Sequence, residues 1–337
     1  MENILVVFPG ALGDFICFLP ALENLARDRT VDLLSRSEYA DLVPAAVHAR
    51  SVERYEITRL FVPGSERDER LKRFFASYKS IYSWMGSGQK DFVRNIEHLS
   101  RGSVKLFPFR PPDSAVHISD YYLSCVTEKP SGGTFPAVPL RSDVVAWSRR
   151  WLSEKGFEDK KILVLAPGSG AKEKNWPGEF FRQVERWWGK EEGGRSLVIL
   201  GPAEEGWSGD FHDWSGAPVA RNLDLAKVAA WLSLCDLYLG NDSGLTHLAA
   251  AVGAETVALF GPTDPKQWAP RGKRVTVVSQ SVECSPCARW VMKTCPHRKC
   301  LTTLKTDAVT SLLHGLLAST ETRLLHGRLL DKGVGRH

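Results

Sequence analysis

Several short loops combine glycine with polar side chains, and each directly follows an apolar run. The most informative is residues 239–253, LGNDSGLTHLAAAVG, where a strand-like run ends and a helix-forming stretch starts at once. Free N–H groups at such a helix start, together with the positive end of the helix dipole, favour a phosphate. We expect the first-turn residues Thr246 and His247 to reach the same anion. The candidate donor-site residues here are Asp242, Ser243, Gly244, Leu245, Thr246 and His247.

A second loop, residues 166–177, reads APGSGAKEKNWP. Its glycines and Ser169 would expose backbone N–H groups, and Lys174 adds positive charge, which suits a phosphate or diphosphate. The G-K-[ST] ending of a Walker A loop is absent. An ordinary surface turn with solvated lysines remains the alternative. The candidate residues are Ser169, Gly170 and Lys174.

Acidic and aromatic side chains occur in the other loops of this kind. In residues 201–206, Glu204 or Glu205 could accept hydrogen bonds from ribose hydroxyls, or be solvated in the first turn of a helix. Trp176 and Trp268 could stack on a sugar or base, or pack within the protein. Two further loop or N-cap candidates are Thr263 and Asp264.

The first loop, residues 9–14, reads PGALGD. Gly10 and Gly13 allow a tight turn and a close approach to a ligand. Asp14 either caps the next helix or points a carboxylate into a cleft as a general base. The G-x-G-x-x-G dinucleotide fingerprint is missing, which disfavours an NAD-dependent oxidoreductase.

Four of the seven cysteines fall close together, as C-x2-C followed at longer spacings by two more. Tetrahedral thiolate ligation of zinc is chemically possible, and a structural loop with reduced thiols or disulfides are the alternatives. The basic residues around them could face an anionic acceptor or a membrane surface. The four are Cys284, Cys287, Cys295 and Cys300, whereas Cys17, Cys125 and Cys235 lie in apolar contexts typical of a core.

The strands and helices that position these loops can be predicted from alternating patterns in the sequence. We predict strands at residues 4–8, 31–34, 80–84 and 104–109, then at 162–166, 196–200, 237–240, 256–260 and 275–279. We predict helices at residues 14–27, 143–155 and 305–317, with others starting near Pro177, Ala203, Asp224 and Leu245. Such alternation implies parallel sheets covered by helices, whose ligands bind beyond the carboxyl ends of the strands.

Length and composition agree with two α/β domains. The chain has 337 residues, and a Pro- and Gly-rich stretch at residues 128–141 reads as a boundary. We therefore expect domains at residues 1–140 and 141–320, with a tail at 321–337 that is frayed from Asp331. A formal net charge of +5 is too small to indicate nucleic-acid binding. Without a basic signal-peptide start or a membrane-spanning run, we expect a cytoplasmic protein.

Several motifs together resemble glycosyltransferase family 9, the ADP-heptose:lipopolysaccharide heptosyltransferases. They are the opening LGD loop, the KNWP segment, and GNDSGLTHLAAAVGAETVALFGPTDP. The resemblance covers the first 25 or so residues and most of the second half. It implies two Rossmann-like domains facing across a cleft, the glycosyltransferase B architecture. The nucleotide-sugar donor would bind the second domain and the acceptor the first.

The resemblance also implies roles for individual residues. Asp14 matches the catalytic base, with Gly10 and Gly13 on the acceptor side. Lys174 matches the lysine that holds the donor diphosphate. The remaining matches to the donor site are Ser169, Gly170, Glu204, Asp242, Ser243, Gly244, Leu245 and His247. One departure is Phe8-Pro9, where family members resembling the inner-core enzymes usually carry a lysine or arginine that helps hold an acidic acceptor.

The implied reaction is transfer of a heptose or related sugar from an ADP-sugar to a lipopolysaccharide core or similar glycan, with inversion. No divalent metal or other cofactor is required in such a site. The expected partners are the nucleotide sugar and a lipid-linked or oligosaccharide acceptor, with peripheral contact at the inner membrane and no nucleic acid. The alternatives are a nucleotide-sugar epimerase or hydrolase on the same fold, and a silent nucleotide-sugar-binding module.

Overall fold

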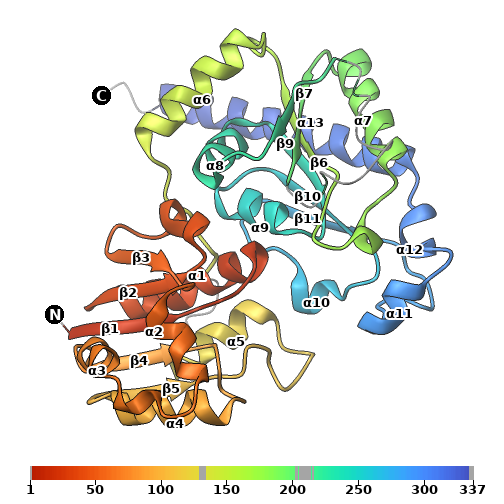
Figure 1. Ribbon diagram of the computed structural model, residues 1–337. Coiled ribbons are helices and arrows are strands. Elements are labelled where there is room, and N and C mark those ends of the chain that lie inside the picture. The colour runs from red at the N-terminus through yellow and green to blue at the C-terminus, as the bar shows by residue number, and fades with distance from the viewer. Residues whose placement is uncertain (1, 129–133, 202–203, 205–213, 215, 334–337) are drawn as a thin grey trace.

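The computed structural model describes residues 2–128, 134–201, 204, 214 and 216–333. Two separate parallel sheets organise this part of the chain, one in each half (Figure 1). The first sheet has five strands in the order β3-β2-β1-β4-β5, and the second has six in the order β11-β10-β9-β6-β7-β8. In both sheets the first strand of the half lies inside the sheet, which is the doubly wound arrangement expected for an α/β fold.

The first half contains alternating strands and helices, as expected, together with short 3-10 helices. Its strands are β1 Glu2–Val7, β2 Arg29–Ser35, β3 Val47–Ser51, β4 Ser80–Ser83 and β5 Ser103–Leu106. Its helices are α1 Leu12–Ala26, α2 Tyr55–Thr58, α3 Glu69–Phe75, α4 Lys90–Leu99 and α5 Ile118–Ser124, with 3-10 helices η1 Ser37–Leu42, η2 Arg59–Phe61 and η3 Ser65–Arg67. The sequence did not predict β3, whose exposed residues alternate with partly buried ones at the edge of the sheet.

The second half has longer helices around its sheet. Its strands are β6 Ile162–Ala166, β7 Arg195–Leu200, β8 Val219–Arg221, β9 Leu237–Asn241, β10 Thr256–Phe260 and β11 Val275–Ser279. Its helices are α6 Ser142–Glu154, η4 Lys172–Lys174, α7 Gly178–Glu191, α8 Leu225–Leu234, α9 Gly244–Ala251, α10 Pro265–Trp268, α11 Arg289–Thr294, α12 Lys299–Thr302 and α13 Thr306–Gly333.

Some differences from the sequence predictions need comment here. The short edge strand β8 was not predicted. The last helix, α13, does not stop near residue 317 but continues to Gly333, so the expected fraying from residue 331 is wrong for residues 331–333. The helix expected near Ala203 and part of the boundary at 128–141 lie outside the described residues. Residues 134–141 form no helix or strand, and the proposed domain boundaries stay predictions.

Alternation along the buried strands divides the core into layers. In β1, Ile4 and Val6 face α1 and α5, whereas Leu5 and Val7 face the side covered by α2, α3 and α4. In the second half, α6, α8 and α9 cover one face of the sheet, and α7 and α13 cover the other. One apolar cluster includes both α1 and α9 and joins the two halves.

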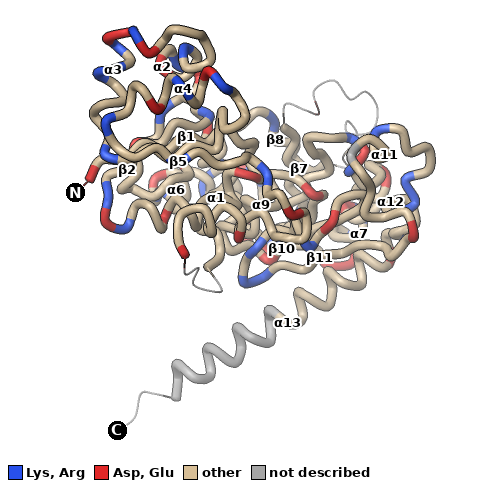
Figure 2. The backbone as a smooth tube through the Cα atoms, turned by 90° about the horizontal axis from the view of Figure 1, so that it is seen from below, with Lys and Arg blue, Asp and Glu red and all other residues tan. Residues whose placement is uncertain are grey.

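The two halves therefore meet helix to helix. Figure 1 shows α1 and α9 side by side between the sheets, and α5 also contacts α1. Basic and acidic residues are interspersed over both halves (Figure 2). No described helix is both long and apolar enough to cross a bilayer.

Candidate active site

Two helix starts face each other where the halves meet. A Cβ added to Gly244, the first residue of α9, would lie 2.7 Å from the Leu12 Cβ and 3.1 Å from the Gly13 backbone nitrogen. The first N–H groups of an α-helix have no partner within the helix, and they carry the positive end of its dipole. The junction thus brings together two sets of anion-attracting backbone groups, one from each half.

The first loop reaches this junction through a tight turn. A Cβ at Gly10 would lie 2.4 Å from a ring carbon of Phe8 and 2.9 Å from the Asp14 Cβ, so only glycine fits there. The Tyr39 hydroxyl donates to the Gly10 carbonyl at 3.2 Å and fixes the turn. Phe8 itself is fully buried and stacks on Phe18 at 4.2 Å.

Asp14 does not cap α1. The residue before the helix is Ala11, without a side-chain cap, and Asp14 lies in the first turn. Its carboxylate instead accepts hydrogen bonds from both terminal nitrogens of Arg110, at 2.5 and 3.1 Å. The N-cap interpretation was therefore wrong, and the carboxylate is directed out from the helix start.

Sequence reasoning missed Arg110. Its guanidinium lies 4.4 Å from the Phe109 ring centroid and 4.8 Å from that of Trp268, which belongs to the second half. It also donates to the Tyr122 hydroxyl at 3.3 Å. A signal was present, because Arg110 directly follows a predicted strand, where chemistry-bearing residues of an α/β fold are expected.

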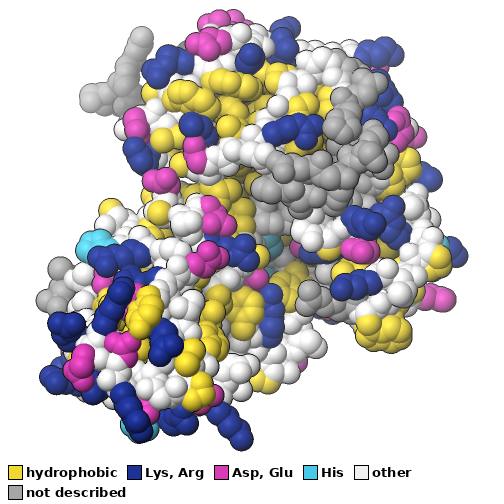
Figure 3. Space-filling model, in the orientation of Figure 1, with side chains coloured by type: hydrophobic (Ala, Val, Ile, Leu, Met, Phe, Trp, Pro, Cys, Tyr) yellow, Lys and Arg dark blue, Asp and Glu magenta, His cyan; other side chains and the backbone are white. Residues whose placement is uncertain are grey.

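Two further contacts join α5 of the first half to the segment that follows α10 in the second half. The His117 Nε2 lies 2.9 Å from the Ala269 carbonyl oxygen, and Arg271 pairs with Asp120 at 2.6 Å. Burial lowers the pKa of His117, because it disfavours the charged form of the ring. The space-filling view shows charged side chains of both signs next to this junction (Figure 3).

Lys174 and Asp242 form an ion pair beside the start of α9. The Lys174 ammonium donates to Asp242 Oδ2 at 2.9 Å and to the Asp242 carbonyl at 3.2 Å. Thr263 donates to the same carboxylate oxygen at 2.7 Å. The Asp242 side chain is nearly buried, and the Lys174 side chain is 22% exposed. Asp242 therefore orients the lysine, and Thr263 fixes Asp242.

The loop that carries Lys174 is held by buried amides. Asn241 accepts a hydrogen bond from the Trp176 backbone N–H at 2.9 Å and donates to the Pro167 carbonyl at 2.7 Å. Ser169 Oγ lies 2.7 Å from Asn175 Oδ1, so its hydroxyl stabilises the loop. The sequence did not predict these roles for Asn241 and Asn175. A Cβ at Gly170 would meet nothing within 4 Å, so space is open beside it.

Glu204 lies against the same loop. A Cβ at Gly168 would lie 2.1 Å from Glu204 Oε1, so the carboxylate packs directly on the glycine. Burial raises the pKa of Glu204, although its Oε2 accepts the Gly201 N–H at 2.6 Å. Glu204 is thus close to the second loop, as the ribose-binding hypothesis requires.

Three expectations about side chains in these loops are corrected or refined. Thr246 cannot reach an anion, because its hydroxyl is fully buried and donates to the Asn241 carbonyl. Trp176 is equally buried and donates its indole N–H to the Leu304 carbonyl at 2.8 Å, so it does not stack on a ligand. Asp264 is an N-cap, since it accepts the Lys266 N–H at 2.9 Å.

The cysteine loop shows no ligand arrangement. Cys284, Cys287, Cys295 and Cys300 are all free thiols. Burial raises the pKa of Cys300 to about 11, and nearby Cys287 contributes. In the described parts of the chain, no three or more His, Cys, Asp or Glu side chains are placed to hold a metal ion.

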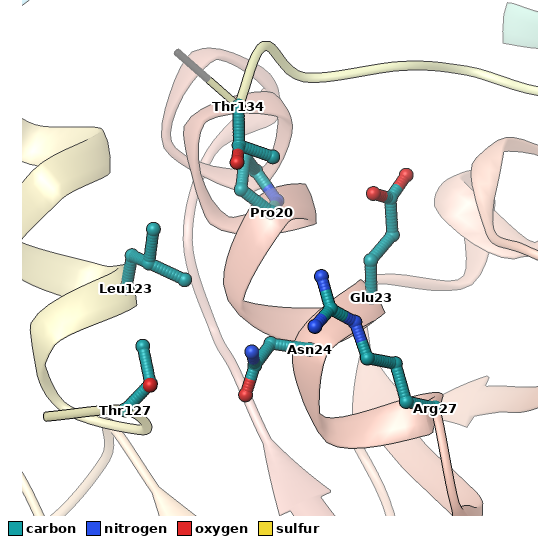
Figure 4. A pocket seen from close by; sticks show the side chains of 7 residues that line it. All are labelled: Pro20, Glu23, Asn24, Arg27, Leu123, Thr127 and Thr134. Atoms are coloured by element: carbon teal, nitrogen blue, oxygen red, sulfur yellow. The ribbon is translucent and has the colours of Figure 1, made fainter. Parts of the chain in front are cut away.

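A pocket of about 260 Å³ lies away from this junction, at the far end of α1 (Figure 4). It is lined by Pro20, Glu23, Asn24, Arg27, Leu123, Thr127 and Thr134. Burial raises the pKa of Glu23, and Arg27 opposes this effect. None of the candidate residues from the strand-end loops lines the pocket, so it does not belong to the candidate site.

The fold and the facing helix starts define a two-sheet α/β protein of the glycosyltransferase B architecture. Residues 142–299, which lie in the second half of the chain, match the family model described as glycosyltransferase family 9 (heptosyltransferase). The lipooligosaccharide heptosyltransferase 2 of Campylobacter jejuni is 29% identical over 173 residues, covering 48% of this chain and 52% of that protein. The chain thus spans about half the length of the curated relatives it matches.

Solved structures agree on the fold over almost the whole chain. A glycosyltransferase family 9 protein from Veillonella parvula has a TM-score of 0.74 at 19% identity, covering 94% of this chain and 98% of that one. The Escherichia coli heptosyltransferase WaaC with ADP has a TM-score of 0.64 at 16% identity, covering 93% and 99%. At these identities the likeness concerns the fold.

Proposed function

We propose that this protein is an inverting glycosyltransferase. It transfers a heptose or related sugar from an ADP-sugar to a lipopolysaccharide core or similar glycan acceptor, with Asp14 as general base. The observation that carries the proposal is the position of Asp14 at the start of α1, where α1 meets the start of α9 from the other half. A base from one half thereby lies next to an anion-attracting helix start from the other.

The chemistry follows from this placement. A carboxylate accepts the proton of an acceptor hydroxyl as that oxygen attacks the anomeric carbon of the donor sugar. The bond to the nucleoside diphosphate breaks in the same step, so the anomeric configuration inverts. Lys174 and the N–H groups at Ser243 and Gly244 stabilise the charge that develops on the leaving diphosphate. Arg110 would have to release one carboxylate oxygen when the acceptor binds.

Two likenesses support the identity of the substrates. The curated relatives that match are lipopolysaccharide or lipooligosaccharide heptosyltransferases, and one structural neighbour was solved with ADP. We extend both to this chain as part of the proposal, and we keep peripheral contact with a membrane-borne acceptor as its corollary. No metal enters the proposed step, because cationic and N–H groups of the chain oppose the diphosphate charge.

The decisive experiment measures nucleotide release from ADP-heptose, UDP-sugars and GDP-sugars, with and without truncated lipopolysaccharide core as acceptor. We expect release from the ADP-sugar only when acceptor is present, and loss of turnover in Asp14→Ala with ADP affinity within about twofold. Release that ignores the acceptor would instead indicate a hydrolase, and donor binding without turnover would indicate a silent module. An Asp14→Ala variant that retains turnover would refute the assignment of the base.

A further inference from the structure

A buried thiol contacts a buried imidazole inside the α1–α9 junction. Cys17 Sγ lies 3.4 Å from His247 Nδ1, and both residues are at least 95% buried. Burial raises the pKa of the Cys17 thiol far above its usual range and lowers the pKa of His247 to about 4. At neutral pH both groups are therefore uncharged. The contact is a hydrogen bond between a neutral thiol and a neutral ring, and its direction depends on the tautomer.

The tautomer determines whether the other edge of the ring, at Nε2, carries a donor. A Cβ at Gly13 would lie 3.2 Å from His247 Cδ2 and 3.6 Å from Nε2, so this edge faces the first turn of α1. Within the described residues, Nε2 has no hydrogen-bond partner. Burial lowers the pKa of the ring most, and the Asp242 and Asp14 carboxylates oppose this effect, whereas the charges of His117 and Lys174 add to it. A proton on Nε2 also leaves Nδ1 free to accept the thiol hydrogen.

We infer that Cys17 is a positioning residue: by donating its thiol hydrogen to Nδ1, it holds His247 as the Nε2–H tautomer and presents one neutral N–H donor at the α1–α9 junction. Resting on the proposed function, this N–H serves the anionic part of the nucleotide sugar. It adds a donor beside the two helix starts without adding another positive charge. The proposed base, Asp14, is a separate group that acts on the acceptor.

The tautomer can be observed directly. In protein labelled with ¹⁵N-histidine, long-range proton–nitrogen correlation distinguishes a protonated Nε2 from a protonated Nδ1, and His247→Gln identifies the resonances among nine histidines. We expect Nε2–H in the unmodified protein and in Cys17→Ser, which keeps a donor. Cys17→Val, which fills the space without a donor, should shift the ring toward a mixture. A proton on Nδ1 in the unmodified protein, or an unchanged tautomer in Cys17→Val, would overturn the inference.

The functional part is tested with ADP as the probe. We expect Cys17→Val to weaken ADP binding about three- to tenfold, as when the Nε2–H tautomer falls to about a third to a tenth of the population, and Cys17→Ser to stay within about twofold. In a His247→Gln background, Cys17→Val should have no further effect, whereas additive losses would contradict the inference. Cys235→Ala, at a partly buried cysteine elsewhere in the protein, serves as the control. If Cys17→Val does not fold, Cys17→Ala replaces it.

The experiments distinguish an error in the proposed function from an error in the role inferred for Cys17. If the unmodified protein does not bind ADP, the proposed function is wrong, while the nitrogen spectra still decide the role of Cys17. If ADP binds but the Cys17 variants leave both tautomer and affinity unchanged, the function stands and Cys17 is only a core residue. Thermal melts of each variant separate a loss of binding from a loss of folding.

Discussion

Arg110 donates hydrogen bonds to both oxygens of the Asp14 carboxylate, with Nη1 at 2.5 Å from Oδ1 and Nη2 at 3.1 Å from Oδ2. A guanidinium is rigid and planar, so such a paired contact sets the orientation of the carboxylate as well as its charge. The Arg110 group also lies over the ring of Trp268 from the second half. The orientation of the proposed base therefore depends on residues far from it in the sequence and in both halves.

This geometry predicts a catalytic defect when Arg110 is changed. Arg110→Ala should lower kcat about tenfold or more, because the carboxylate loses its fixed orientation, and should leave ADP affinity within twofold. Arg110→Lys keeps the charge without the planar fork and should be intermediate. Steady-state ADP release measures the effect, with exposed Arg101→Ala as the control. Full activity in Arg110→Ala would separate Arg110 from the reaction.

The ion pair between Lys174 and Asp242 predicts a different defect. Lys174→Met removes the ammonium that we place on the diphosphate and leaves the nearly buried Asp242 carboxylate without its cation. We expect ADP affinity to fall about tenfold or more, together with kcat. Calorimetric titration with ADP measures this, and Lys160→Met, at an exposed site in another loop, should bind ADP normally. Unchanged ADP affinity in Lys174→Met would remove this lysine from the donor site.

The close approach of α9 to α1 predicts opposite effects at two helical glycines. Gly244→Ala should destabilise the protein by about 1–3 kcal/mol, because the new methyl would lie 2.7 Å from the Leu12 Cβ. Gly189→Ala, inside α7, meets nothing within 4 Å and should stabilise it by about 0.5–1 kcal/mol through helix propensity. Urea unfolding compares the two, and equal stabilisation would mean that the junction is looser than described.

The buried Glu56 predicts a pH-dependent contribution to stability. Burial opposes its ionisation, but hydrogen bonds from Arg54 and Arg70 outweigh this and lower the pKa of Glu56 to about 2. A lowered carboxyl pKa stabilises the folded state above the unfolded value of 4.5, and this contribution is lost as the pH falls from there toward 2.

Glu56→Gln should therefore cost about 2–3 kcal/mol of unfolding free energy at pH 7, and the difference should shrink toward pH 2. Urea unfolding at several pH values measures it. Exposed Glu53→Gln should unfold like the unmodified protein throughout. A difference that is the same at every pH would show that packing, not charge, explains the Glu56 effect.

The proposed donor site predicts that the activity tolerates a chelator. Lys174 and the helix N–H groups supply the opposing charge that a divalent cation supplies in other nucleotide sites. Transfer from ADP-heptose should therefore persist after treatment with a chelator. Activity that disappears on chelation and returns with Mg²⁺ would contradict the proposed mechanism.

Much of the fold was predictable because long buried strands and their loops are local signals. The apolar runs that became β1, β6, β9 and β10 were found nearly at their observed bounds. The edge strands β3 and β8 were missed, because they are short and only partly buried, so they lack a continuous apolar run. The loops that follow the inner strands were also found, because glycine and polar residues interrupt those runs.

For the candidate site, the sequence predicted the positions of several residues but not their contacts. The sequence indicated that Asp14, Lys174 and Asp242 lie at strand ends. It could not indicate that Arg110 holds Asp14, or that Lys174 pairs with Asp242, because those contacts join separate elements. For the same reason Thr246 was misassigned: its position in a first turn suggested an exposed hydroxyl, and tertiary packing buries it against Asn241.

The contact between the halves also limits how this sequence can change. Gly13 and Gly244 bring the starts of α1 and α9 together where backbone meets backbone. At most packed positions a larger residue can be compensated by a smaller residue at the neighbouring position. Glycine cannot compensate in this way, because it has no side chain. No compensating exchange between these two positions is available. Substitutions that adjust how the halves fit must therefore occur elsewhere along the junction. We expect Gly13 and Gly244 to stay glycine as the sequence diverges.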